Sequence, residues 1–142
     1  MTGAKHRGSA SVEFVIVAIS VFVPLIALTV TVSEIQSAQF ATAAVARQGV
    51  RAYALSTSSA VGGRRVSAIS KLVREDFGVD AKSAWKLACS ANPCLTRGGL
   101  IRLTVSSEVP IVMVPMLPGL TVPPTVRVSA TATHIVPVVS GR

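Results

Sequence analysis

The sequence predicts an α+β protein in which one long N-terminal helix carries a small head, made of a second helix and a three-stranded antiparallel sheet. Three observations predict this architecture. Residues 14–32 form an uncharged apolar run. Residues 33–55 contain no proline and are rich in alanine, which is typical of a continuing helix. From residue 79 onward, apolar and polar residues alternate with a period of two, which indicates strands.

The apolar run from Phe14 to Val32 holds 19 residues. As an α-helix it would be about 28 Å long, roughly the thickness of the hydrocarbon core of a bilayer. Its interruptions are Ser20, Pro24, Thr29 and Thr31. A secretory signal peptide has a shorter apolar region that ends at a small-residue cleavage site, whereas helical sequence follows this run. We therefore predict a membrane span at about residues 14–32 within a helix and stalk at 9–55. Pro24 is expected to bend this helix or to free a backbone carbonyl within the membrane.

The charges beside the run predict its orientation. Lys5 and Arg7 precede the run, while Glu34 follows it and the next basic residue is Arg47. Basic flanks stay in the cytoplasm, and only short flanks count for this rule. The sequence therefore predicts a single-pass protein of the cytoplasmic membrane, with its N-terminus inside and its head outside.

A single acid, Glu13, stands at the start of the run, five residues after Gly8. Glycine has no side chain, so a protease can approach the backbone there. Cleavage after Gly8 would free the amino group of Ser9 and make Glu13 the fifth residue of the shortened chain. An ammonium group on a neighbouring copy can neutralise such a carboxylate inside a helix bundle. The alternative is an interfacial glutamate that the dipole of the helix N-terminus stabilises.

The stretch Arg7-Gly8-Ser9-Ala10-Ser11-Val12-Glu13-Phe14 carries a resemblance. It resembles the type IV prepilin signature and, in its local form, the start of TadE-like pseudopilins of the tight-adherence (Flp, type IVb) pilus systems. The resemblance is specific over residues 7–32. It implies cleavage after Gly8 by a membrane prepilin peptidase, with Ser9 as the new N-terminus. It also implies that the Glu13 carboxylate sets the register of subunits in a filament.

The resemblance further implies a role and a set of partners. A shortened chain would begin with Ser9 rather than with a large apolar residue, and 142 residues exceed the length of a Flp-type major subunit. Both features imply a minor pilin or pseudopilin, needed for assembly of the pilus or of a related secretion machine. The implied partners are the prepilin peptidase, other pilins and pseudopilins, the pilus assembly platform and membrane lipid.

Two other functions stay open at this point. One is an unprocessed single-pass envelope protein with an exported binding domain. The other is a competence-type pseudopilin that binds DNA through its basic head, since the chain carries a net charge of +8. Few aromatic residues accompany the basic ones, so nucleic acid is not an expected partner.

The head is expected at residues 56–142, after the leader at 1–8 and the helix and stalk. Residues 56–63 are predicted to form a loop because they are rich in serine and end in two glycines. A second helix is predicted from about Arg64 to Phe77, with Gly78 as its stop. Its apolar face is predicted to contain Val66, Ile69, Leu72, Val73 and Phe77.

Three alternating segments predict a meander of antiparallel strands, packed against a helix on its apolar face. They cover about residues 82–89, 101–106 and 126–133. Cys89 and Cys94 enclose the turn-forming sequence Ser-Ala-Asn-Pro. Outside the cytoplasm these cysteines are expected to form a disulfide, with free thiols as the alternative. A metal site is less expected, because only His6 and His134 accompany the two cysteines.

The segment from Pro110 to Pro124 is apolar and broken by prolines. It predicts an irregular edge strand and loop, or an exposed patch that packs on a partner. Under the second hypothesis, replacing Met113 and Met116 with serine should weaken assembly and leave the monomer folded.

The sequence offers no support for catalysis. It lacks paired carboxylates, a phosphate-binding loop, a nucleophile elbow and a zinc-binding helix. We therefore expect no enzyme activity and no cofactor, and the chain would enter chemistry only as a substrate of the peptidase.

Overall fold

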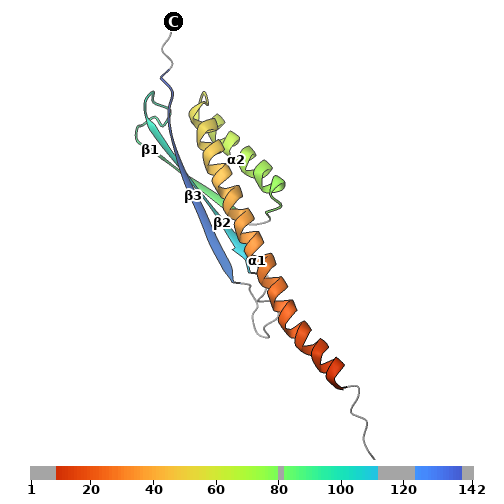
Figure 1. Ribbon diagram of the computed structural model, residues 1–142. Coiled ribbons are helices and arrows are strands. Elements are labelled where there is room, and N and C mark those ends of the chain that lie inside the picture. Colours follow the sequence, from red (N-terminus) through yellow and green to blue (C-terminus); the bar gives the residue numbers. More distant parts are fainter. Residues whose placement is uncertain (1–8, 80–81, 112–123, 139–142) are drawn as a thin grey trace, which may run out of the picture.

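The computed structural model describes residues 9–79, 82–111 and 124–138. Its elements, in chain order, are α1 (Ser9–Ala54), α2 (Ser59–Asp76), β1 (Lys82–Cys89), β2 (Leu100–Pro110) and β3 (Thr125–Ile135). Figure 1 shows that the N-terminal half of α1 projects away from the other elements, while its C-terminal half lies against the sheet and beside α2. The α+β class, the long helix, the second helix and the three strands are those that the sequence predicts.

The helix α1 contains 46 residues, which corresponds to a rod of about 69 Å. It passes through Pro24 as one continuous element. Its end at Ala54 lies one residue before the predicted end of the stalk. The turn to α2 is short, with backbone hydrogen bonds from Leu55 N to Arg51 O and from Ser56 N to Tyr53 O.

Small residues on the C-terminal half of α1 bring it close to the head. Ala38 and Val45 are almost fully buried, and Gly49 is buried as well. A Cβ atom on Gly49 would lie 2.8 Å from Leu103 Cδ2 in β2 and 3.5 Å from a methyl carbon of Val66 in α2. The small residues of this part of α1 therefore serve close packing inside the chain itself.

The helix α2 begins five residues earlier than predicted. Ser58 is its N-cap, and the Ser58 side chain accepts a hydrogen bond from Val61 N at 3.3 Å. The predicted loop is therefore wrong for residues 59–63. The two glycines lie inside the first turns of the helix, and Gly62 faces the ring of Tyr53 on α1. The absence of a side chain at Gly62 allows this close packing, and neither glycine forms a turn.

Gly78 ends α2 as predicted. Its φ of 60° lies in the left-handed region, which glycine adopts without steric cost. The Gly78 amide donates to Glu75 O at 3.2 Å and the Val79 amide donates to Arg74 O at 2.9 Å. These two bonds form a Schellman motif, which satisfies carbonyl groups at the helix end.

The buried face of α2 differs from the predicted one. Its buried members are Gly62, Val66, Ser70 and Val73. Val66 and Val73 of the predicted apolar face are buried, whereas Leu72 is 58 % exposed and Phe77 is 43 % exposed, so the covered part of that face is narrower than the pattern indicates. Because α2 lies so close to α1, its contact face requires small side chains, and the larger apolar residues lie outside it.

The three strands form one antiparallel sheet in the order β1-β2-β3, the predicted meander. Trp85 of β1 lies opposite Val105 of β2, which lies opposite Ala130 of β3. Along β2, buried and less buried residues alternate from Leu100 to Pro110. The strand extends four residues beyond the predicted end at residue 106, because Ser107 and Val109 continue the buried face.

Both helices cover the same face of the sheet. The helix α1 contacts β2 and β3, and α2 packs on α1. The Ser70 and Ser83 hydroxyls lie 3.3 Å apart, which joins α2 to β1. The core between these layers is built from Ile101, Leu103 and Val105 of the central strand, together with the small face of α1. Among the described residues, no helix covers the other face of the sheet.

The apolar segment after β2 lies largely outside the described residues. The Ile111 amide donates to Pro124 O at 2.8 Å, so the two ends of the segment lie together. Met113 and Met116 fall within residues 112–123, which the structure does not describe. The hypothesis of a partner-binding patch there stays a prediction.

Candidate functional site

The N-terminal half of α1 is apolar on all sides and is almost uncovered. Fourteen of its large apolar residues are between 44 % and 73 % exposed: Val12, Phe14, Val15, Ile16, Val17, Ile19, Val21, Phe22, Val23, Leu25, Ile26, Leu28, Val30 and Val32. Such a surface on a helix needs an apolar environment, since contiguous exposed apolar patches on soluble proteins are small. Within the described residues, α1 is the one helix long and apolar enough to cross a membrane.

The hydroxyl groups within the apolar run are all satisfied by the helix itself. Ser20 Oγ donates to Ile16 O at 2.7 Å, and Thr29 Oγ1 donates to Leu25 O at 2.8 Å. Thr31 makes the same type of bond to Ala27 O at 2.9 Å. A hydroxyl without a partner is costly in an apolar medium. These residues therefore interrupt the apolar sequence without exposing an unsatisfied donor.

Pro24 leaves one backbone group of the run without its usual partner. Proline has no amide hydrogen, so the helical bond to the carbonyl of residue 20 is missing. In the hydrocarbon core of a bilayer, such a carbonyl needs a donor from a neighbouring helix or from water. Because α1 continues through Pro24, the carbonyl of residue 20 lacks its usual amide donor, as the sequence predicts.

Glu13 lies one turn into α1 and is exposed. It shares a shallow surface hollow with Val12, Ile16 and Val17. No ion pair to Glu13 occurs among the described residues. The structure thus places a lone carboxylate among apolar side chains at the start of the exposed apolar surface. Ser9 is the first residue of α1, and Gly8 lies outside the described residues, so cleavage after Gly8 stays a prediction.

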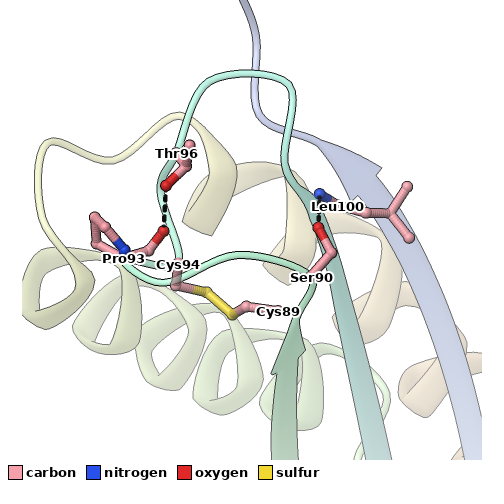
Figure 2. The surroundings of a disulfide bond; sticks show 6 residues. All are labelled: Cys89, Ser90, Pro93, Cys94, Thr96 and Leu100. Carbon is pink, nitrogen blue, oxygen red and sulfur yellow. Dashed lines mark hydrogen bonds between the residues drawn. A yellow bond between two sulfur atoms is a disulfide. The ribbon is translucent and has the colours of Figure 1, made fainter.

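The predicted cysteine pair closes the turn between β1 and β2 (Figure 2). Cys89 and Cys94 form a disulfide, with their Cα atoms 5.3 Å apart. Ser90 Oγ accepts a hydrogen bond from Leu100 N at 2.8 Å, and Thr96 Oγ1 donates to Pro93 O at 2.6 Å. The turn is therefore held by polar contacts as well as by the covalent bond.

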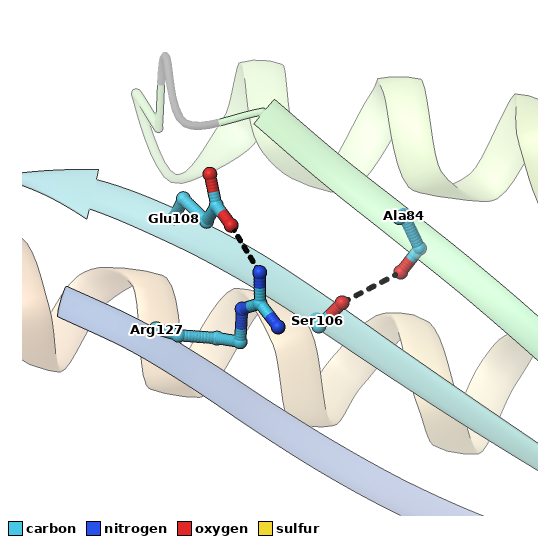
Figure 3. Close-up of polar contacts among 4 residues, drawn as sticks. All are labelled: Ala84, Ser106, Glu108 and Arg127. Atoms are coloured by element: carbon cyan, nitrogen blue, oxygen red, sulfur yellow. Dashed lines mark hydrogen bonds and ion pairs between the residues drawn. The ribbon is translucent and has the colours of Figure 1, made fainter. Parts of the chain in front are cut away.

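The open face of the sheet carries hydroxyl groups and one ion pair (Figure 3). Glu108 on β2 pairs with Arg127 on β3, and Ser106 Oγ donates to Ala84 O. The Thr104 and Thr131 hydroxyls lie 3.0 Å apart on the same face. The ion pair is exposed on both sides and therefore stabilises the fold little, by roughly 0–1 kcal/mol. The sequence predicts these residues only as the polar, solvent-facing side of the strands; it does not predict the ion pair between Glu108 and Arg127.

Within the described residues, no three His, Cys, Asp or Glu side chains gather closely enough to hold a metal ion. His134 lies in β3, where its Nδ1 is 2.7 Å from Ile135 O. Because a carbonyl only accepts, Nδ1 carries the hydrogen in this contact.

Comparison of the chain with protein-family models, with curated proteins and with solved structures finds no match.

Proposed function

We propose that this chain is a minor pseudopilin, a structural subunit needed to assemble a tight-adherence-type pilus or a related secretion machine. In this proposal, α1 crosses the cytoplasmic membrane through residues 14–32 and the head lies outside. A prepilin peptidase removes the leader after Gly8. The chain then joins other pilins by packing of its apolar helix.

The observation that carries this proposal is the position of Glu13. An acid at the centre of a membrane helix costs roughly 2.5–3.5 kcal/mol, and ionisable residues in a membrane usually mark function. Glu13 stands at the edge of the apolar surface, without a described ion-pair partner, and its neighbours in space are Val12, Ile16 and Val17. The new amino group on a neighbouring copy supplies a matching charge, and the pairing sets the axial position of one helix against the next.

Two further features support packing against other helices. The carbonyl of residue 20, which lacks the amide donor that Pro24 cannot supply, can accept a hydrogen bond from a neighbouring helix. Phe40, beyond the apolar run, is 64 % exposed on α1, so one large apolar side chain near the head is left uncovered. In a bundle of such helices, a neighbouring helix can contact both the carbonyl of residue 20 and the Phe40 side chain, whereas a single helix has no such neighbour.

The experiment is an intact-mass measurement on the full chain recovered from its host, combined with two variants. We expect the mass to correspond to loss of residues 1–8 and Gly8→Phe to block that loss. Glu13→Ala should be trimmed normally and yet enter the assembled filament or machine at least about tenfold less. Glu34→Ala is the matched control, because it removes an acid from α1 outside the apolar run, and it should assemble normally.

A functional protein that retains Met1 to Gly8 would contradict the proposal. It would favour the alternative of an unprocessed single-pass envelope protein. Equal assembly of the Glu13 and Glu34 variants would remove the proposed role of Glu13 and leave the trimming itself standing.

A further inference from the structure

A groove of about 370 Å³ lies between the C-terminal half of α1 and the end of β3 nearest the disulfide turn. Arg47 and Arg51 line it from the helix, and Thr133 and His134 line it from the strand. Both arginines are exposed, and they stand one helical turn apart. Their side chains therefore lie along the same groove.

The arginines in this groove have no acidic partner among the described residues. The two ion pairs found there, Lys71 with Glu75 and Arg127 with Glu108, lie elsewhere. The sequence contains no acid between Glu34 and Glu75 and none after Glu108. Guanidinium groups match carboxylates in geometry and in charge. The groove thus holds two positive charges that the described part of the chain does not compensate.

The strand beside the groove has a free edge. Ile111 N donates to Pro124 O, and Val136 N donates to Gly99 O, each at 2.8 Å. In an antiparallel pair, such bonds recur at every second residue. The even-numbered residues of β3 therefore bond to β2, and the odd-numbered residues 125–135 direct their amide and carbonyl groups outward. Among the described residues, no strand pairs with this side.

We propose that this groove and the adjoining edge of β3 bind an extended acidic segment of a partner protein. The segment adds a fourth strand to the sheet, and its acidic side chains meet Arg47 and Arg51. The spacing fits: side chains on one face of a strand repeat every ~6.7 Å, and residues one turn apart on a helix are separated by ~6 Å. Main-chain hydrogen bonds supply affinity in this mode of binding, and the side-chain contacts supply specificity.

A second copy of this chain does not fit as the occupant through its own sheet edges. The strand at the other edge, β1, contains Lys82 and Lys86 and no acid. The strand β3 contains Arg127 and no acid. Pairing two copies edge to edge would bring like charges together, which costs binding energy. The charge of the groove therefore selects a different, acidic chain.

The test uses the full chain in detergent micelles and a fluorescent ten-residue peptide of alternating Glu and Val. We expect the fluorescence anisotropy of this peptide to rise on binding. A control peptide with Gln in place of each Glu should bind at least about tenfold more weakly. Arg47→Glu with Arg51→Glu should weaken binding of the Glu–Val peptide by a similar factor. Arg64→Glu with Arg65→Glu is the matched control, because it makes the same charge change on α2, away from the groove, and it should change binding less than about twofold.

The edge is tested at Thr133, whose amide points outward. Thr133→Pro removes that amide and should abolish binding, whereas Thr133→Val keeps the amide and should bind normally. If the proline variant fails to fold, hydrogen exchange on the wild-type chain gives the same information. Addition of the peptide should then slow exchange at the Thr131 and Thr133 amides.

Four results of these experiments would overturn the proposal, and a fifth comes from a competing ligand. The four are absence of binding by the Glu–Val peptide, equal losses from both arginine pairs, equal behaviour of the two Thr133 variants, and unchanged exchange at the β3 edge. Tighter binding of a single-stranded oligonucleotide that is insensitive to Thr133→Pro would identify a general anion surface and would also overturn it. The proposal does not depend on trimming after Gly8.

Discussion

Adjacent glycines in the first turns of α2 have different surroundings. A Cβ atom on Gly62 would lie 2.6 Å from Tyr53 Cδ2, closer than side chains approach in proteins. A Cβ atom on Gly63 would meet only Trp85 Cη2, at 3.8 Å. The absence of a side chain is thus required at Gly62 and is not required at Gly63.

This difference predicts opposite effects of the same substitution. Gly63→Ala should stabilise the head by about 0.5–1 kcal/mol, because alanine favours a helix more than glycine does. Gly62→Ala should destabilise it by roughly 1–3 kcal/mol, because the Tyr53 ring must move in a packed core. Urea unfolding of the full chain in micelles, followed by circular dichroism and by the emission of Trp85, measures both. Equal effects of the two substitutions would show that Tyr53 does not restrict the position.

At the scale of residues, the sequence predicts the contacts that follow from local pattern and misses those that depend on a distant partner. The stop at Gly78 is predictable because it uses neighbouring backbone groups. The role of Gly62 is not, since it depends on Tyr53 in another helix. The exposure of Leu72 is not predictable either, because hydrophobicity alone does not reveal which part of the apolar face of α2 is covered by other elements.

The turn between β1 and β2 combines a covalent link with hydrogen bonds. The disulfide joins residues five apart in the sequence. Ser90 and Leu100 pair through the Ser90 amide at 2.9 Å and through the Ser90 side chain, one residue after Cys89. The strands are therefore already held together where the disulfide closes the turn.

Loss of the disulfide should accordingly weaken the head without unfolding it. Closure of so short a ring is expected to stabilise the fold by about 2 kcal/mol through the entropy of the unfolded chain. Reduction of the wild-type chain, or Cys89→Ser with Cys94→Ser, should lower the urea midpoint by the corresponding amount and keep the sheet signal in circular dichroism. Reductant should leave the double variant unchanged, which is the control. A head that unfolds on reduction would show that the hydrogen bonds of the turn cannot hold it.

At the scale of elements, period and composition predict most of the fold. The strands are found because apolar residues alternate over a sheet with one wet face. The extension of β2 to Pro110 is missed because Ser107 is polar, and its burial depends on the Thr42 hydroxyl of α1, 3.4 Å away. The start of α2 is missed because paired glycines usually mark a loop. Both errors arise where tertiary contacts outweigh local preference.

The whole molecule is organised by a change of environment along α1. Up to Val32 its apolar side chains are exposed, and from Ala38 onward one side of the same helix is buried by the sheet and α2. One continuous helix thus joins an uncovered apolar rod to a folded head (Figure 1). The charge is distributed unevenly as well. Arg47 and Arg51 lie in a stretch of the sequence without acidic residues, between Glu34 and Glu75.

This arrangement predicts which positions water-soluble reagents reach in cells. Thr57 lies in the exposed turn after α1, and the end of that helix is about 33 Å beyond the apolar run. Thr57→Cys should therefore react with a membrane-impermeant maleimide in cells whose cytoplasmic membrane is intact and whose outer layers have been removed. Ser20→Cys, in the middle of the run, should stay unlabelled even after permeabilisation, because thiolates do not form in hydrocarbon. The native cysteines are joined in a disulfide and give no background. Labelling of Thr57→Cys only after the membrane is opened would reverse the orientation, and labelling of both variants from outside would show that α1 does not lie in the bilayer.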